Sequence, residues 1–182
     1  MSRRKLLTLA LLTEGGLLVV AIGAARYFHI DFISSYGHIL RDFLLGLLFS
    51  VMPLALFILF CLRPPAFLNS FRRVILHDIR RLFAGTTALD IVLISLLAGL
   101  GEEFLFRGVL QAKIGIIWSS LIFGLFHCLS PAYFVFATVM SLYLGELYIH
   151  FNGVTAAVSA HFAYDLGALI YIRFIYKDEL IP

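Results

Sequence analysis

The chain has 182 residues, of which 62% are hydrophobic and only 14% are charged. This composition excludes an ordinary soluble globular domain, in which about 25% of the residues are charged, and indicates an integral membrane protein. The net charge of +3 comes mostly from arginines beside the apolar segments, so it bears on membrane topology and argues against a nucleic-acid partner.

The apolar segments are continuous, without the alternation of a β-barrel, and therefore predict helices. A membrane-crossing helix needs about 20 residues, so the chain has room for roughly six of them. We predict an all-α polytopic membrane helix bundle that forms a single domain over residues 1–182. Its spans are expected at residues 6–25, 43–62, 88–111, 113–129, 131–149 and 153–175.

Basic residues beside the first two spans predict the orientation of the chain. Arg3, Arg4 and Lys5 precede the first span, and a second basic group follows the second span. Both groups lie on one side of the membrane, and the positive-inside rule makes that side cytoplasmic. We expect both termini there, in a bacterial inner membrane. The basic start is typical of a signal peptide, but residues 6–25 are long and lack a small-residue cleavage site, so we expect an uncleaved first span.

The segment between the second and third spans is amphipathic. Its apolar residues share one helical face and its basic residues cover the other, which predicts an interfacial helix on the membrane surface. The apolar face comprises Phe71, Ile75, Ile79, Leu82 and Phe83, and the basic face comprises Arg72, Arg73, His77, Arg80 and Arg81. We assign this basic face to lipid headgroups and give it no catalytic role.

The third span contains Glu102, Glu103 and Arg107 within an otherwise apolar run. Each charge at membrane depth costs about 2.5–3.5 kcal/mol on insertion scales, so these groups must pair or face a polar cavity. Glu103 and Arg107 are four residues apart and therefore lie on one helix face. The segment is thus a candidate functional site.

Further ionisable groups lie in the later spans, as His127, His161 and Asp165. His127 follows Phe123 by four residues and Asp165 follows His161 by four, so each pair shares a helix face. A rise of about 1.5 Å per residue places Glu102, His127 and His161 about 14, 22 and 13 Å from the outer ends of their helices. We therefore predict that these groups meet near mid-membrane.

Two isolated carboxylates, Glu14 and Glu146, also lie within predicted spans. Neither has a partner nearby in the sequence. We expect each either to line the cavity or to serve in helix packing at its edge.

Three patterns occur in order along the second half of the chain: EExxxR at Glu102, Glu103 and Arg107, FxxxH at Phe123 and His127, and HxxxN/D at His161 and Asp165. On these residues, over about 85–175, the chain resembles the CPBP family of intramembrane proteases, which includes CAAX-prenyl endopeptidases and bacterial Abi-type proteins. The family's weaker glycine motif is only partly matched, because Gly145 fits but Ser141 occupies the other small position.

The resemblance implies a glutamic-type endopeptidase that cleaves a membrane-associated protein or peptide. In this scheme Glu102 and His127 activate a water molecule as a general base, without a covalent intermediate. His161 and Asp165 would form the oxyanion site. An ionised Asp165 cannot donate a hydrogen bond as the family's Asn does, so Asp165 is expected either to be protonated through desolvation or to orient His161. Glu103 and Arg107 would compensate each other's charge, or Arg107 would bind a substrate carboxylate.

The resemblance implies C-terminal processing, removal of a sorting tail or maturation of a bacteriocin-type peptide, with no cofactor. Expected partners are membrane lipid and a hydrophobic or membrane-anchored peptide. A zinc peptidase that uses the same residues is an alternative, although no HExxH motif is present. An ion or proton carrier and a peptide-binding immunity protein also stay open as functions of such a chain. Serine and aspartyl protease signatures are absent.

Overall fold

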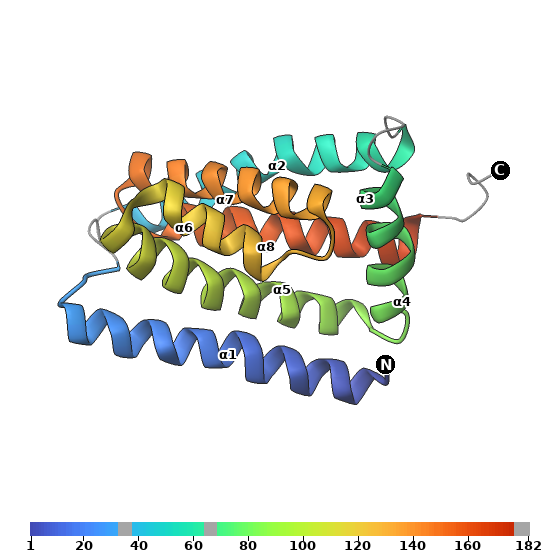
Figure 1. Cartoon of the computed structure of the whole chain (residues 1–182), viewed down its shortest axis with the longest axis horizontal. Helices are drawn as coiled ribbons and strands as arrows, with labels where there is room; N and C mark the ends of the chain where they lie inside the picture. The colour runs from blue at the N-terminus through green and yellow to red at the C-terminus, as the bar shows by residue number, and fades with distance from the viewer. Residues whose placement is uncertain (33–37, 64–68, 177–182) are drawn as a thin grey trace.

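The chain folds into a bundle of long helices that run side by side (Figure 1). The computed structural model describes residues 1–32, 38–63 and 69–176. Its main helices are α1 (Arg3–Phe28), α2 (Ile39–Leu62), α5 (Ala88–Glu103), α6 (Ala112–Phe126), α7 (Pro131–Phe151) and α8 (Thr155–Ile170). π-Helical turns extend α5 as η4 (Phe104–Gln111) and α8 as η5 (Tyr171–Ile175). The predicted all-α membrane helix bundle is confirmed.

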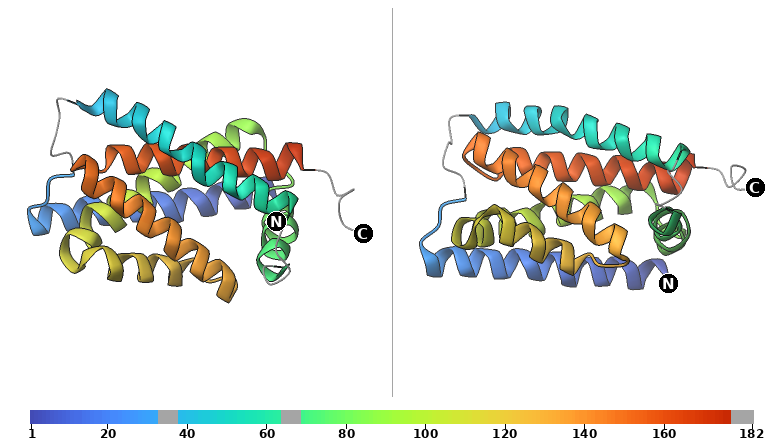
Figure 2. Two further views of the ribbon diagram at one scale, coloured as in Figure 1. Left: turned by 90° about the horizontal axis from the view of Figure 1, so that it is seen from above. Right: turned by 45° about the horizontal axis from the view of Figure 1, so that its top comes forward.

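Helix α8 is the central element, because α2, α5 and α7 all pack against it. Helix α1 packs against α5 and η4, and α6 packs against α7 and η4. Consecutive main helices run in opposite directions, so that α1, α5 and α7 run one way and α2, α6 and α8 the other (Figure 2). This order brings the end of α5, the end of α6 and the middle of α8, which carry the three motifs, into one region.

The bundle has the lengths and apolar surface of a membrane protein. Within the described residues, α1, α2 and α7 are each long and apolar enough to cross a bilayer. The α5–η4 and α8–η5 tracts are continuous helical stretches over residues 88–111 and 155–175. Leucine and valine side chains such as Leu12, Val19 and Leu48 are exposed on the outside of α1 and α2. An exposed apolar surface of this kind faces lipid.

Helix α6 is shorter than the predicted span at 113–129. Gly115 interrupts it with a φ of 82°, a left-handed conformation that glycine adopts without steric cost, and the helix ends at Phe126. The stretch that follows Gly115 is only about 16 Å long. Ser130 and Pro131 then cap and begin α7, and this start signal, invisible to hydropathy, ends the preceding helix early. The α6–α7 connection consequently stops short of the end where α2 and α5 meet α3 and α4 (Figure 1).

The predicted interfacial helix is present as a tract formed by α3 (Asn69–Arg73), η3 (Val74–Ile79) and α4 (Arg80–Leu82). It crosses the end of the bundle (Figure 1). Phe71, Ile75 and Phe83 are buried as expected, whereas Leu82 is exposed because the tract ends there. The basic face also contacts the chain itself, since Arg80 hydrogen-bonds the backbone carbonyl of Tyr176 at 3.2 Å.

Two contacts fix α1 and α5 relative to each other. Thr87 and Asp90 form a capping box at the start of α5, and the Asp90 carboxylate also accepts hydrogen bonds from Arg3 at 2.7 and 2.8 Å. Further along, a Cβ atom at Gly101 would overlap the backbone carbonyl of Glu14. Only glycine permits this close helix approach, which brings α1 against the residue that precedes Glu102.

Candidate active site

Glu102 and Glu103 lie at the end of α5, where the α-helix changes to the π-helical turns of η4. Both side chains are buried, with relative exposures of 7% for Glu102 and 0% for Glu103. As neighbours in a helix they point in different directions, so Glu103 contacts Arg107 and Glu102 contacts His127, while His161 lies near both. π-Helical turns inside a helix often occur at functional sites.

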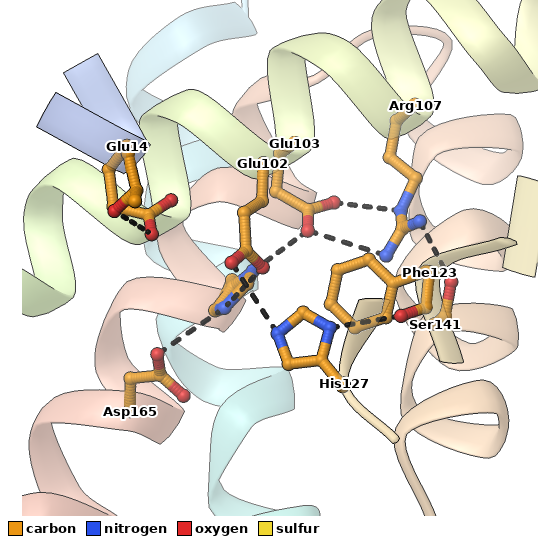
Figure 3. A network of polar contacts seen from close by, with 10 residues as sticks. Glu14, Glu102, Glu103, Arg107, Phe123, His127, Ser141 and Asp165 are labelled. Carbon is orange, nitrogen blue, oxygen red and sulfur yellow. Dashed lines mark hydrogen bonds and ion pairs between the residues drawn. The ribbon is translucent and has the colours of Figure 1, made fainter. Parts of the chain in front are cut away.

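Arg107 holds the carboxylate of Glu103. Its Nε atom lies 2.8 Å from Oε2 of Glu103, and its Nη2 atom donates to Oε1 at 3.3 Å. Its Nη1 atom donates to the Ser141 hydroxyl at 2.9 Å, and the guanidinium lies over the Phe123 ring at 5.2 Å from the ring centre. Arg107 is fully buried, so this cluster compensates a charge that has no access to water (Figure 3).

His161 lies among three carboxylates. Its Nδ1 atom is 2.8 Å from Oε1 of Glu103, the same oxygen that Arg107 contacts. Its Nε2 atom lies 3.4 Å from Oδ2 of Asp165 and 3.7 Å from Oε2 of Glu102. Glu103 is an acceptor, so Nδ1 carries the proton of this hydrogen bond and Nε2 faces the other two carboxylates.

His127 approaches Glu102 from the other side. It is the residue that ends α6, and it lies in no helix, contrary to our prediction. Its Nδ1 atom donates to the carbonyl oxygen of Phe123 at 2.9 Å, and its ring stacks on the Phe123 ring at a centre-to-centre distance of 4.3 Å. These contacts direct Nε2 toward Oε1 of Glu102 at 3.5 Å, beyond an ordinary direct hydrogen bond (Figure 3). The two atoms are too close for a water to lie between them, so a water that bridges them would lie beside the pair.

A cavity of about 120 Å³ connects these groups. One water needs roughly 10–15 Å³ by the same measure, so the cavity has room for several. Its lining consists of Glu102, Phe123, His127, Tyr133, Phe136, Ala137, Met140, Leu144, His161, Tyr164 and Asp165. The Oε2 atom of Glu102 is buried here and has no hydrogen-bond partner among the described residues. The site therefore offers an unpartnered carboxylate oxygen beside space for water.

The two isolated carboxylates have different surroundings. Glu14 of α1 is partly buried and interacts electrostatically with Glu102, His161 and His127. Glu146 of α7 is exposed and lies outside the cavity lining. The expectation that such residues line the cavity or lie at its edge fits Glu14, which contacts the back of α5, whereas Glu146 belongs to the outer surface of the bundle.

The structure brings together all six residues that the motifs singled out, namely Glu102, Glu103, Arg107, His127, His161 and Asp165. Their catalytic roles stay predictions. Sequence reasoning missed the bridge from Arg107 through Glu103 to His161, the hydroxyl of Ser141 as a partner of Arg107, and Tyr133 and Tyr164 in the cavity lining. The role of Ser141 was predictable in part, since it is a polar residue at a helix-packing position of an apolar span.

The zinc alternative requires several ligand side chains around one metal ion. Over residues 1–32, 38–63 and 69–176, no group of three or more His, Cys, Asp and Glu side chains is arranged to hold one metal ion. Catalytic zinc sites use three protein ligands at about 2.0–2.3 Å from the metal. Whether the chain uses a metal ion stays a prediction.

Fold and site together define a membrane-embedded helical protein with a buried centre of carboxylates and histidines beside a small cavity. Residues 84–167 match the family model of type II CAAX prenyl endopeptidase Rce1-like proteins. This segment contains all three motifs, and the resemblance that they indicated is confirmed over it. The family is one of proteases, so the match supports peptidase activity.

A relative among curated proteins is "Uncharacterized protein YpbD" of Bacillus subtilis (strain 168). It is 36% identical over 98 residues, which cover 52% of this chain and 52% of the relative. The chain thus spans about half the length of this relative. No solved structure matches the chain.

Proposed function

We propose that the chain is an intramembrane endopeptidase that hydrolyses a peptide bond of a membrane-associated protein or hydrophobic peptide. The observation that carries the proposal is the buried Oε2 atom of Glu102, unpartnered among the described residues and adjoining a cavity with room for water. Two histidines direct Nε2 atoms toward the same carboxylate at 3.5 and 3.7 Å. A carboxylate, a histidine and a water in this arrangement suit general-base hydrolysis.

The proposed reaction begins with a water in the cavity that contacts both Glu102 and Nε2 of His127. Glu102 takes one proton of the water, while Nε2 of His127, whose proton resides on Nδ1, accepts a hydrogen bond from the other. The water oxygen attacks the peptide carbonyl carbon, and the carbonyl electron pair moves to the oxygen. When this intermediate collapses, the C–N bond breaks and the amine takes the proton from Glu102.

The proposed substrate class follows from the surroundings of the cavity. An apolar groove of about 380 Å³ between α2 and α7 is lined by Pro53, Leu56, Phe57, Phe60, Phe71, Ala132, Val135, Phe136, Val139 and Met140. Phe136 and Met140 line both this groove and the cavity. An apolar segment in the groove would therefore place an adjoining peptide bond near Glu102. C-terminal processing, sorting-tail removal and bacteriocin-type maturation all use such substrates.

We also propose a location in the bacterial cytoplasmic membrane with both termini inside. The N-terminal Arg3 and the basic face of the α3–α4 tract lie at the same end of the bundle, as the positive-inside rule requires (Figure 1). In this orientation, the α6–α7 connection stops short of the cytoplasmic end of the bundle.

A comparison of protein termini tests this function. The wild type and Glu102→Gln are expressed in the native host, and the termini of membrane proteins and secreted peptides are compared by mass spectrometry. We expect at least one terminus that is present with the wild type and lost with Glu102→Gln. Equal membrane levels and equal thermal stability of the two proteins serve as the control. Identical termini would instead favour transport or peptide binding.

We further propose that hydrolysis needs no metal ion, because a carboxylate already activates the water. The cleavage rate of the purified protein is therefore expected to remain unchanged after incubation with 1,10-phenanthroline and dialysis. A loss of activity that added Zn²⁺ restores would contradict this prediction and favour the zinc mechanism.

A further inference from the structure

The proposed hydrolysis needs a hydrogen-bond donor for the negative charge that develops on the carbonyl oxygen. His161 can meet this need only in its imidazolium form. Its Nδ1–H donates to Glu103 at 2.8 Å, so Nε2 of the neutral ring has no proton to give. In the imidazolium form, Asp165 at 3.4 Å and Glu102 at 3.7 Å compete for the Nε2 proton. Asp165 itself, as a carboxylate, only accepts.

Tyr133 places a different donor in the same cavity. It lies in the first turn of α7, immediately after the connection that follows His127, and its side chain belongs to the cavity lining. Phe71 and Phe136 hold its ring, with ring-centre distances of 5.5 and 6.1 Å. The same cavity is lined by Glu102 and Asp165, whose carboxylate oxygens lie 3.7 and 3.4 Å from Nε2 of His161.

The hydroxyl of Tyr133 makes no hydrogen bond to another described residue. Among residues 1–32, 38–63 and 69–176, the recorded hydrogen bond of Tyr133 is that of its backbone N–H to Ser130, at 3.1 Å. A tyrosine hydroxyl in an apolar setting normally has a partner, because an unmade hydrogen bond is costly. A hydroxyl on a cavity-lining side chain, with no hydrogen bond to another described residue, is suited to bind a water or a substrate oxygen.

We propose that Tyr133 is a further catalytic residue, whose O–H donates a hydrogen bond to the peptide carbonyl oxygen as this oxygen becomes an alkoxide. This inference rests on the proposed function. During attack, Glu102 takes the water proton, and the carbonyl electron pair moves to the oxygen that Tyr133 contacts. During collapse the C=O bond re-forms and the amine takes the proton from Glu102. Tyr133 keeps its own proton throughout.

Tyr171 supplies the matched control. It lies in η5 and belongs to the same buried cluster as Phe57 and Cys61, outside the cavity lining. Its side chain is buried, with a relative exposure of 8%. Replacement of Tyr171 by phenylalanine therefore controls for the loss of a hydroxyl from a buried tyrosine.

The test compares Tyr133→Phe and Tyr171→Phe in the full chain, reconstituted in liposomes. The probe is an internally quenched peptide that spans the junction found in the comparison of termini. We expect kcat of Tyr133→Phe to fall by about 100-fold or more, the usual effect of removing one oxyanion donor. KM should change less than threefold, and Tyr171→Phe should retain kcat within about threefold. A reduced-amide peptide, which has no carbonyl oxygen at the junction, should bind both variants and the wild type equally.

The outcomes separate the two proposals. Cleavage by the wild type with full kcat in Tyr133→Phe would overturn the role of Tyr133 and leave the peptidase intact. A rise in KM with unchanged kcat would make Tyr133 a substrate-binding residue and would also overturn it. An equal loss of kcat in both variants would point to a structural effect and would overturn it as well. If the wild type cleaves nothing, the proposed function and this inference fail together.

Discussion

Replacement of Glu102 by glutamine is expected to lower the cleavage rate by about 1,000-fold or more. Glutamine has nearly the same shape but takes no proton, so the variant loses general-base catalysis, which contributes about 10²–10⁴-fold, and the carboxylate that positions the water. Two histidines already surround the position at 3.5 and 3.7 Å, so the fold should tolerate an uncharged amide there. The initial rate on the quenched junction peptide in liposomes measures the effect.

Glu146→Gln is the matched control for this experiment. Glu146 undergoes the same chemical change within a membrane helix, but its side chain is exposed and lies away from the cavity lining. Its rate should stay within about twofold of the wild type. Retention of more than a tenth of the activity by a folded Glu102→Gln protein would rule out Glu102 as the base.

The second large effect concerns stability. Arg107→Met is expected to reduce the free energy of unfolding by about 3–5 kcal/mol, because it leaves the carboxylate of a buried ion pair without its partner. Glu103 has no exposure to water, and Arg107 supplies two of its contacts. Methionine fills a similar volume, so lost packing contributes little. Unfolding in mixed detergent micelles with increasing SDS measures the change.

A double variant distinguishes a charge effect from a packing effect. Adding Glu103→Gln to Arg107→Met removes the uncompensated carboxylate, and the unfolding free energy should recover by at least half. Replacing both charges of a buried pair is often nearly neutral for stability. A double variant as unstable as Arg107→Met alone would show that the guanidinium acts through Phe123 and Ser141 and not through Glu103.

Local sequence spacing accounts for much of the site. Glu103 and Arg107 are four residues apart, and so are His161 and Asp165, and both pairs contact each other as predicted. The meeting of Glu102 with the two histidines was predicted from their depths, all near mid-membrane, an argument that needs only the helical rise. The amphipathic segment was likewise predictable, because its apolar face repeats with helical period.

Other features depend on contacts between helices that no spacing rule contains. The hydrogen bond between His161 and Glu103 joins residues 58 positions apart. Local spacing therefore predicted the pair of Glu103 and Arg107, whereas the structure adds His161 as a third member. The end of α6 was missed because residues 113–129 are uniformly apolar, while the cap at Ser130 and the kink at Gly115 determine the length. Tyr133 looked like one of several aromatic residues until that connection placed it beside His127.

The arrangement of charges has a consequence for membrane insertion. Glu103 and Arg107 neutralise each other within one helical turn, so α5 and η4 enter the bilayer with this pair complete before any later helix is made. Glu102 differs, since the histidines around it come from the end of α6 and the middle of α8. Glu102, the proposed general base, therefore does not have both histidines until α8 has been synthesised. A chain that stopped before α8 would lack His161, and His127 would then be the remaining histidine beside this carboxylate.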